Sequence, residues 1–383
     1  MKFLIAQTLF LGDTILSLPL AQRLKETVRE AEIDFLVDAD VAGILENHPA
    51  VSSVIPFDRR RAHIGIRGIL TVSRELRKRR YDSAIVLPGS VWTAFSVFLA
   101  RIPKRIGSDQ SSGMLLFHDM VKFPSELKRP LRNRVIYLAE RLWKLLAGSG
   151  SFVSIFFTEV VRLRRDVHVA QRYLALLEPL GIASRTAEPP RLYPDREDKQ
   201  MVDSLIGAEQ RERVGVAPGS VWQTKRWPAE NYSQLITQLQ KETTGRKLQF
   251  VLVGGVDDVP LCKQIHSEVG DADVLDCSGK LTVLQSAELI GRCRVLVTND
   301  AAPMHLASAM GTPCVAIYGP TVPAFGFVPF GNEYAIIESG SLWCRPCTPH
   351  GGHRCPIGTH VCMREISVNL VFDTVTKFLR LAV

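Results

Sequence analysis

The sequence predicts an α/β protein built from two Rossmann-like domains that face a central cleft. Three observations predict this class. The chain has 383 residues, more than a single hydrophobic core usually spans. Short apolar runs alternate with amphipathic stretches in both halves, as in parallel strands joined by helices. A stretch with three prolines, 186–198, lies between the halves and is the best candidate for a linker.

The first half predicts one βα array. Short apolar runs that we interpret as strands lie at Lys2–Gln7, Ile33–Val37, Ser53–Pro56, Ser83–Leu87 and Lys104–Ile106. Segments that we interpret as helices lie at Thr14–Arg29, Ile66–Arg80, Val91–Arg101, Arg132–Ala147 and Val167–Leu180. We therefore expect a first domain over 1–185 and a linker over 186–200.

The alternation restarts after the linker and predicts a second domain over 201–340. Its expected strands are Val214–Ala217, Leu248–Val253, a strand near Val274, Val295–Thr298 and Cys314–Tyr318. Its expected helices are Ala229–Glu242, Val259–Val269 and Thr282–Ile290. The remaining residues, 341–383, are a cysteine-rich tail and a last helix, Ser367–Leu379, with Ser367 as its N-cap.

Composition and termini predict a cytoplasmic protein. Apolar residues make up 46% of the chain and charged residues 22%, and no apolar run reaches the roughly 18 residues that a spanning helix needs. The N-terminal run FLIAQTLFLG is similar to a secretion signal, but Asp13 interrupts it and no small-residue cleavage site follows Leu20. A first buried strand fits this run better, and we expect the cysteines to be reduced.

The positive charge is concentrated in the first half. The net charge is +8, and residues 1–190 hold 28 Lys and Arg against 19 Asp and Glu. This asymmetry predicts an anionic partner, either a phosphorylated glycolipid or a membrane surface, with Arg60, Arg61 and Arg105 as candidate contacts. A solvated face remains the alternative for any single cluster. Nucleic acid is not expected, because no recognised motif or interleaved aromatic residues accompany the basic clusters.

Two loops that follow predicted strands carry the strongest functional signal. In VAPGSVWQTKRWP, a strand leads into a small-residue loop with Gly219 and Ser220, followed by Lys225 and a helix start. Ligands bind at the carboxyl ends of parallel strands, and a helix N-terminus suits a diphosphate. Lys225 would neutralise that charge, although it could also be an ordinary surface lysine. Gly254 and Gly255 end another strand and could line the same pocket, or form an ordinary turn.

The second loop is VTNDAAPMH. Asp300 follows a strand, and Ala301 and Ala302 would allow a ligand to approach the backbone closely. His305 lies in the first turn of the next helix and could face the same pocket. Two alternatives stay open: Asp300 could cap that helix, and His305 could be structural.

Asp13 follows the first strand in TLFLGDTILSLPL. Gly12 would let the chain turn there, and Asp13 would stand at or just inside a helix start. One interpretation is an N-cap aspartate. The other is a general base that takes a proton from an attacking hydroxyl.

The tail contains four clustered cysteines, Cys344, Cys347, Cys355 and Cys362. In a reducing compartment they predict a structural zinc site, although the spacing is not that of a standard zinc finger. Two disulfides or free thiols are the alternatives. The other four cysteines lie in apolar segments and are expected in the core: Cys262, Cys277, Cys293 and Cys314.

Taken together, these segments resemble glycosyltransferase family 9, the lipopolysaccharide heptosyltransferases, over nearly the whole chain. The segments that carry the resemblance are LGD before TILSLPL, PGSVWQTKRWP, LVGG, SGKLTVLQSAELI and VTNDAAPMHLASAMGTPCVAIYGP. Their combination is specific, although each segment alone is not. The tail, WCRPCTPHGGHRCPIGTHVCM, is similar to the type II branch of the family.

The resemblance implies a GT-B fold whose C-terminal helix returns to the N-terminal domain, and metal-independent, inverting transfer from ADP-heptose. The family's catalytic base falls on Asp13, its phosphate-binding residues fall on Ser220 and Lys225, and its donor-sugar aspartate and histidine fall on Asp300 and His305. Leu281 matches a position that packs against adenine, and Gly12 is assigned to the acceptor side. The chain departs from the family at Ala301-Ala302, where Ser/Thr-Gly is common.

The sequence therefore predicts an inverting transferase that moves heptose to a lipopolysaccharide inner-core acceptor at the inner face of the cytoplasmic membrane. No cofactor is expected for catalysis, and zinc is expected only in a structural role. Two alternatives stay open. One is a nucleotide-sugar epimerase of similar architecture, and the other is a non-catalytic binding protein that uses the four cysteines as an interaction module.

Overall fold

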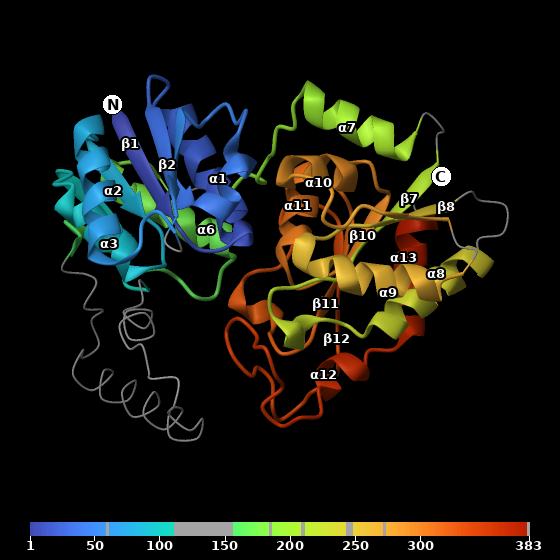
Figure 1. Ribbon diagram of the computed structural model, residues 1–383. Helices are drawn as coiled ribbons and strands as arrows, with labels where there is room; N and C mark the ends of the chain where they lie inside the picture. Colours follow the sequence, from blue (N-terminus) through green and yellow to red (C-terminus); the bar gives the residue numbers. More distant parts are fainter. Residues whose placement is uncertain are drawn as a thin grey trace. The chain divides into compact units, whose positions relative to one another are not determined.

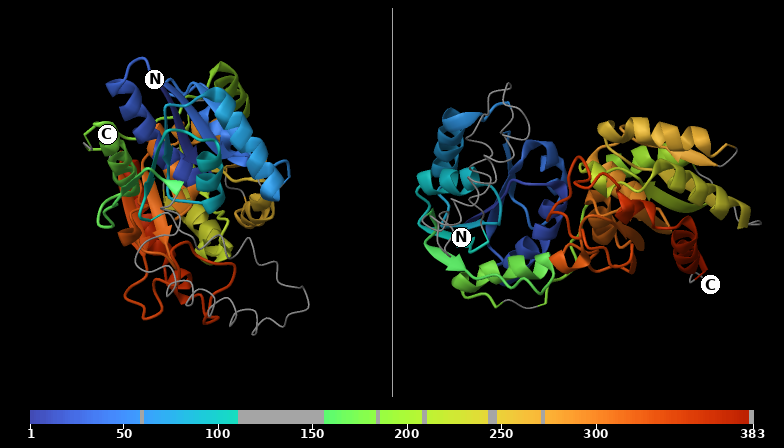
Figure 2. Two further views of the ribbon diagram at one scale, coloured as in Figure 1. Left: turned by 90° about the vertical axis from the view of Figure 1, so that its left-hand side faces the viewer. Right: turned by 90° about the horizontal axis from the view of Figure 1, so that it is seen from below.

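The computed structural model describes residues 1–58, 61–110, 156–183, 186–207, 211–242, 248–270 and 273–380. The chain divides into two compact units, Met1–Ala187 and Glu188–Val383. Each unit is a six-stranded sheet with helices on both faces, as Figures 1 and 2 show.

The sheet of the first unit is wholly parallel and has the strand order β3-β2-β1-β4-β5-β6. Its strands are β1 (Lys2–Gln7), β2 (Glu32–Asp38), β3 (Ser53–Phe57), β4 (Ser83–Val86), β5 (Lys104–Ser108) and β6 (Glu159–Val161). β1 and β4, which are not consecutive in sequence, pair in the register Phe3↔Ser83. Because buried strands need no polar face, the central strands are continuous apolar runs rather than alternating ones.

Helices cover both faces of this sheet. They are α1 (Leu11–Thr27), α2 (Gly65–Arg79), α3 (Val91–Leu99) and α6 (Val169–Leu174). One core cluster joins α2 and α3 to the strands through side chains such as Val72, Val97 and Ile55. α1 packs against α6. This packing fixes the start of α1, where Asp13 lies.

The second unit has the strand order β12-β11-β10-β7-β8-β9, and these pairs are also parallel. Its strands are β7 (Glu212–Ala217), β8 (Leu248–Leu252), β9 (Val274–Asp276), β10 (Val295–Asn299), β11 (Cys314–Tyr318) and β12 (Tyr334–Glu338). β7 and β10 pair in the register Thr298↔Ala217. The loops that follow these two strands therefore leave the sheet side by side.

The helices of the second unit are α7 (Arg196–Ile206), α8 (Ala229–Glu242), α9 (Val259–Glu268), α10 (Val283–Gly291), α11 (Ala302–Met310), α12 (Val361–Arg364) and α13 (Val368–Arg380). One core cluster joins α8, α9, α12 and α13 to one face of the sheet, while α10 packs against α7 and α11. α13 packs within the second unit, where Val371 and Val375 are fully buried and the helix contacts α8. The return of this helix to the N-terminal domain stays a prediction.

Counted within each unit, the two strand orders are the same, 3-2-1-4-5-6. In such doubly wound sheets the order reverses between the first and fourth strands, and ligands bind at the carboxyl ends of those strands. The reversal lies between β1 and β4 in the first unit, and between β7 and β10 in the second. The candidate residues that follow β1, β7 and β10 therefore lie at these two switch points.

Several elements differ from the predicted ones. The helix predicted at Val167–Leu180 is α6 followed by a 3-10 helix, Ala175–Leu180, because Pro179 cannot continue α-helical hydrogen bonding. α7 begins at Arg196, inside the predicted linker, with a capping box between Asp195 and Asp198. β6 and β12 were not predicted. The helix predicted at Arg132–Ala147 lies outside the described residues.

A buried histidine makes the stability of the first unit depend on pH. His48 is 3% exposed, its Nδ1 accepts the N–H of Ala50 at 3.2 Å, and burial lowers its pKa from 6.5 to about 4. Between pH 6.5 and about 4, His48 therefore binds a proton in the unfolded chain but stays neutral in the folded chain. The contribution of neutral His48 to the free energy of unfolding is fully present above pH 6.5. It is lost as the pH falls to about 4, and the loss is at most about 3 kcal/mol.

We expect the free energy of unfolding of the wild-type protein to fall by about 2–3 kcal/mol more between pH 7 and pH 4.5 than that of His48→Asn, which cannot titrate. Urea denaturation at the two pH values measures this difference. His266→Asn, at an exposed histidine on α9, is the control and should follow the wild type. Identical pH dependence of wild type and His48→Asn would contradict the expectation.

Candidate functional site

The loops at the switch point of the second unit are tied together by Asn299, the last residue of β10. Its side chain is fully buried, and its Oδ1 accepts the backbone N–H of Trp227 and the hydroxyl of Tyr232, both at 3.0 Å. Its Nδ2 donates to the carbonyl of Pro218 at 2.7 Å. One amide thus holds both ends of the loop between β7 and α8 against β10.

Lys225 and Asp300 meet at this switch point. Lys225 Nζ lies 2.6 Å from Asp300 Oδ2, and the two side chains are only 11% and 9% exposed. Thr321, which follows β11, donates its hydroxyl to the same oxygen at 2.6 Å. This contact brings the two loops together. The alternative of Asp300 as a helix cap does not hold, because α11 has Ala301 at its N-cap and no side-chain cap bond.

The loop after β7 is shaped by Asp258, which the sequence did not single out. A Cβ on Gly219 would lie 2.2 Å from the carboxyl carbon of Asp258, so only glycine fits there. Arg226 donates to the carbonyl of Ser220 through both Nε and Nη2, at 2.9 and 2.7 Å, and its Nη2 also lies 3.3 Å from Asp258. Burial raises the pKa of Asp258, while the N–H of Gly255 and the charge of Arg226 act in the opposite direction.

The loops after β8 and β9 lie beside this one. The N–H of Gly255 donates to Asp258 at 3.1 Å, and the N–H of Gly279 donates to the carbonyl of Gly254 at 2.9 Å. Leu281 is half-buried just before α10, whose N-cap is Thr282. The predicted residues Gly254, Gly255 and Leu281 therefore share the edge of the sheet with Gly219, as adjacent strand ends require.

The start of α11 completes this edge. Ala301 and Ala302 are half-buried at its N-terminus, next to Asp300. His305 lies in the first turn but is only 5% exposed. Ser220 is 8% exposed, and its hydroxyl accepts the N–H of Trp222 at 3.3 Å.

In the first unit, Asp13 lies at the switch point after β1. α1 begins at Leu11 with Phe10 as its N-cap, so Asp13 is the third helical residue and is not the N-cap. Tyr173 on α6 donates its hydroxyl to Asp13 Oδ1 at 3.3 Å. Burial, followed by the Asp13 carboxylate, raises the pKa of Tyr173 well above its ordinary value, so this phenol stays a donor.

The candidate acceptor residues have different surroundings. Gly12 is buried inside the first turn of α1, and the chain turns into the helix at Phe10, two residues before Gly12. Arg61 is exposed. Arg105 donates from Nε to the carbonyl of Phe156 at 2.8 Å and from Nη1 to that of Ile102 at 2.6 Å, and so supports the packing around β5. Arg60 lies outside the described residues.

Two of the tail cysteines, Cys355 and Cys362, have pKa values shifted in opposite directions. Burial, followed by the Cys347 and Cys355 thiols, raises the pKa of Cys362 to about 11. Burial also acts to raise the pKa of Cys355, but backbone N–H groups, first that of His360, lower it below its ordinary value. All eight cysteines are free thiols, which does not support the disulfide alternative.

Among the described residues, no three His, Cys, Asp or Glu side chains form a group that could hold a metal ion. The structural zinc site stays a prediction. The four cysteines in apolar segments are all buried, as expected.

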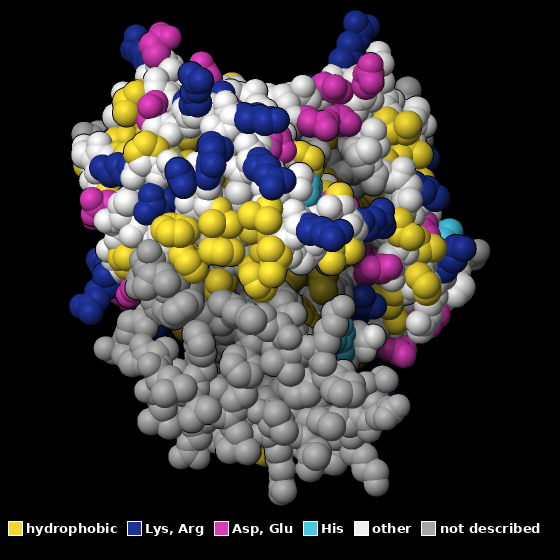
Figure 3. Space-filling view, turned by 60° about the vertical axis from the view of Figure 1, so that its left-hand side comes forward, with side chains coloured by type: hydrophobic (Ala, Val, Ile, Leu, Met, Phe, Trp, Pro, Cys, Tyr) yellow, Lys and Arg dark blue, Asp and Glu magenta, His cyan; other side chains and the backbone are white. Residues whose placement is uncertain are grey.

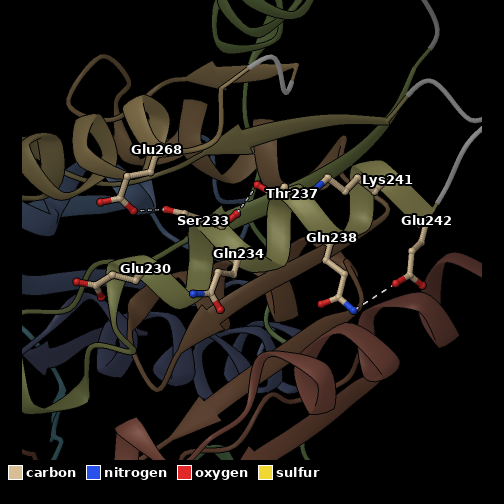
Figure 4. Close-up of a pocket in the computed structure, with 8 residues that line it drawn as sticks. All are labelled: Glu230, Ser233, Gln234, Thr237, Gln238, Lys241, Glu242 and Glu268. Atoms are coloured by element: carbon tan, nitrogen blue, oxygen red, sulfur yellow. Dashed lines mark hydrogen bonds between the residues drawn. The ribbon is translucent and has the colours of Figure 1, made fainter.

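A pocket of about 430 Å³ lies elsewhere on the second unit, along α8. Figure 4 shows its lining, in which Ser233 bonds Glu268 and Gln238 bonds Glu242. These polar side chains satisfy one another, and none of the predicted site residues lines the pocket. We assign it no function.

Comparison with known proteins decides the family. The model of glycosyltransferase family 9 (heptosyltransferase) matches residues 69–149 and 146–353, which is well over half of the chain. The chain belongs to glycosyltransferase family 9. It is therefore a glycosyltransferase, and the family match includes every donor-side residue named above, from Gly219 to His305.

Individual relatives agree with the family 9 assignment. Lipopolysaccharide heptosyltransferase 2 of Salmonella typhimurium is 28% identical over 336 residues, with 85% of this chain and 84% of the relative covered. The family 9 glycosyltransferase of Veillonella parvula matches with a TM-score of 0.78, 22% identity and coverage of 100% and 98% of the two chains. ADP-heptose heptosyltransferase II of Escherichia coli matches with a TM-score of 0.71, 23% identity and coverage of 99% and 98%. These matches confirm the predicted GT-B fold.

The residues that sequence reasoning missed in this family 9 member are Asn299, Asp258, Thr321 and Tyr173. Asn299 stands beside Asp300 in the NDAA segment and could have been noticed as a polar residue at a strand end. No local pattern marks the other three, although Asp258 and Thr321 lie close to predicted segments. Their roles follow only from the folded contacts.

Replacing Asn299 tests its role in the donor-side loops. We expect Asn299→Asp to lower the free energy of unfolding by roughly 3 kcal/mol or more, because a carboxylate cannot donate to Pro218 and a charge is buried without a partner. Chemical denaturation measures the change. Asn332→Asp is the control, since this half-buried amide bonds Ser308 and the carbonyl of Thr312 away from these loops. Equal losses in the two variants would contradict the expectation.

Proposed function

We propose that this protein transfers heptose from ADP-heptose to a lipopolysaccharide inner-core acceptor, with inversion at the anomeric carbon. The observation that carries the proposal is the buried Lys225–Asp300 pair at the switch point of the second unit. The names of the relatives support the substrate class. Solved Escherichia coli heptosyltransferases with ADP and with ADP-2-deoxy-2-fluoro heptose share the fold.

On the donor side, the diphosphate would lie against the loop at Gly219 and Ser220 and the N-terminus of α11. Lys225 supplies the positive charge that stabilises the leaving diphosphate as the bond to the sugar breaks. Asp300 holds Lys225 and accepts a hydroxyl of the sugar. The half-buried Ala301 and Ala302 leave the backbone accessible there, without the hydroxyl common in the family.

On the acceptor side, Asp13 acts as the general base. It takes the proton of the acceptor hydroxyl while that oxygen attacks the anomeric carbon, and ADP leaves with the electron pair of the broken C–O bond. The Tyr173 hydroxyl orients the carboxylate through Oδ1. No metal takes part in this proposed step.

The alternatives make different demands on the site. An epimerase would change the donor without an acceptor, and a binding protein would need no base at Asp13. The family assignment favours transfer over both.

The test is ADP release from ADP-heptose, with and without a heptosylated, phosphorylated lipid A–Kdo acceptor. We expect release to depend on the acceptor and Asp13→Asn to lower kcat by roughly two to four orders of magnitude, the usual range for a lost general base. Glu26→Gln is the control, because Glu26 is an exposed acid in the last turns of the same helix.

Near-normal turnover of Asp13→Asn would leave Asp13 as a structural residue. Isomerisation of the donor without release of ADP would support the epimerase instead.

We further propose that the first unit binds the inner face of the cytoplasmic membrane. None of the described helices is long and apolar enough to cross a membrane. Ile64 and Ile66 at the start of α2 are 60% and 68% exposed, and Arg67 and Arg74 are exposed on the same helix. Figure 3 shows hydrophobic side chains gathered beside a band of Lys and Arg on this side of the molecule. Such a surface suits an anionic bilayer.

We expect the protein to sediment with phosphatidylglycerol vesicles and not with phosphatidylcholine vesicles, and binding to weaken in 0.5 M salt. The double variant Ile64→Ser/Ile66→Ser should bind at least about 10-fold more weakly, because two apolar side chains no longer enter the interface. Met201→Ser/Leu370→Ser, at residues of the second unit that are 45% and 48% exposed, is the control. Unchanged vesicle binding of the isoleucine variant would refute this surface.

A further inference from the structure

Two side chains hold the Asp300 carboxylate through the same oxygen. Lys225 Nζ and Thr321 Oγ1 each lie 2.6 Å from Oδ2. A hydroxyl and an ammonium on the same oxygen fix the plane of the carboxylate, and Oδ1 is the atom left to a ligand. The Thr321 hydroxyl donates to a charged carboxylate, and such hydrogen bonds are stronger than those between neutral groups.

Thr321 is itself held by the cysteine-rich tail. Its carbonyl accepts a hydrogen bond from Nη2 of Arg345 at 2.9 Å, and the N–H of Cys347 donates to the carbonyl of Pro320 at 2.9 Å. The Arg345 side chain is 7% exposed and also bonds the carbonyl of Ser339 and the carboxylate of Glu338, at 3.1 and 2.7 Å. The turn that carries Thr321 is therefore attached to the tail by a buried arginine.

The same tail also holds the residue next to Lys225. The N–H and the hydroxyl of Thr224 donate to the carbonyl of Gly352, at 3.0 and 2.9 Å, and the N–H of Gly352 donates back to that hydroxyl at 2.8 Å. His360 Nε2 lies 2.7 Å from the carbonyl of Thr224. A Cβ on Gly351 would lie 3.1 Å from Cγ of Lys225, so this turn of the tail lies beside Lys225.

We propose that Thr321 is a positioning residue for Asp300, and that Arg345 positions Thr321, so that the cysteine-rich tail is a working part of the donor site. This inference rests on the proposed function. The tail supports Lys225 through Thr224 on one side and Asp300 through Thr321 on the other. The tail thereby sets the distance between Lys225 and Asp300, the two groups that face the donor. The hydrogen bond from Thr321 orients the Asp300 carboxylate so that Oδ1 accepts a sugar hydroxyl.

The experiment compares Thr321→Val with Thr321→Ser. Valine matches threonine in shape but has no hydroxyl, whereas serine keeps the hydroxyl. We expect Thr321→Val to raise the Kd for ADP-heptose about 10-fold or more, as the loss of a bond to a charged group implies, and to raise KM more than it lowers kcat. Thr321→Ser should stay within about 2-fold of wild type. The Kd for ADP, which lacks the sugar, should change less than that for ADP-heptose.

Arg345→Lys tests the second step. Lysine keeps the charge but cannot form the arginine's forked contacts, so we expect a rise of roughly 3- to 10-fold in the Kd for ADP-heptose. Thr312→Val is the matched control, because Thr312 is also buried and its hydroxyl bonds the carbonyl of Ile290 away from the donor loops. It should lower the melting temperature without a change in the Kd.

The outcomes separate the two proposals. A wild-type protein that binds neither ADP nor ADP-heptose would overturn the proposed function together with this inference. A wild-type protein that binds ADP-heptose, with Thr321→Val equal to Thr312→Val in Kd, would overturn the inference alone. If Thr321→Val does not fold, the comparison of Thr321→Ser with Arg345→Lys decides, and equal donor affinities in these two variants would overturn the inference.

Discussion

The donor side of this protein depends on a single buried amide. Asn299 ends β10, is fully buried, and bonds the backbone on both sides of the loop that leaves β7. A buried amide that lost any of these partners would leave polar groups without hydrogen bonds, which costs more than the bonds contribute when formed. The loop therefore has one position relative to β10, and Lys225 is placed within reach of Asp300 as a result.

The shared strand order explains why function concentrates at one edge of each sheet. In both units the order reverses between the first and fourth strands, so neighbouring loops diverge there and leave room for a ligand. Asp13 occupies this place in the first unit, and Lys225 and Asp300 occupy it in the second.

The electrostatics of the donor side are balanced before any ligand binds. Lys225 is paired with Asp300, and Arg226 lies against Asp258, so neither cation is buried without a counter-charge. A diphosphate would share these cations with the carboxylates already present. The tail adds hydrogen bonds around both loops, and the charge of its Arg345 is balanced by Glu338.

The sequence by itself determined the fold class, the family and the two strand–loop–helix segments, because apolar periodicity and small-residue loops are short-range patterns. It also placed Asp13, Lys225 and Asp300 in segments that follow strands. Only the tertiary structure decided that Asp13 is not a cap, that Thr321 bonds Asp300, and that the tail holds Thr224. These contacts join residues as far as 136 positions apart, and a hydrogen bond over such a separation leaves no local signal. The capping box of α7 is a local pattern, but we interpreted the prolines before it as a linker and therefore missed the helix start.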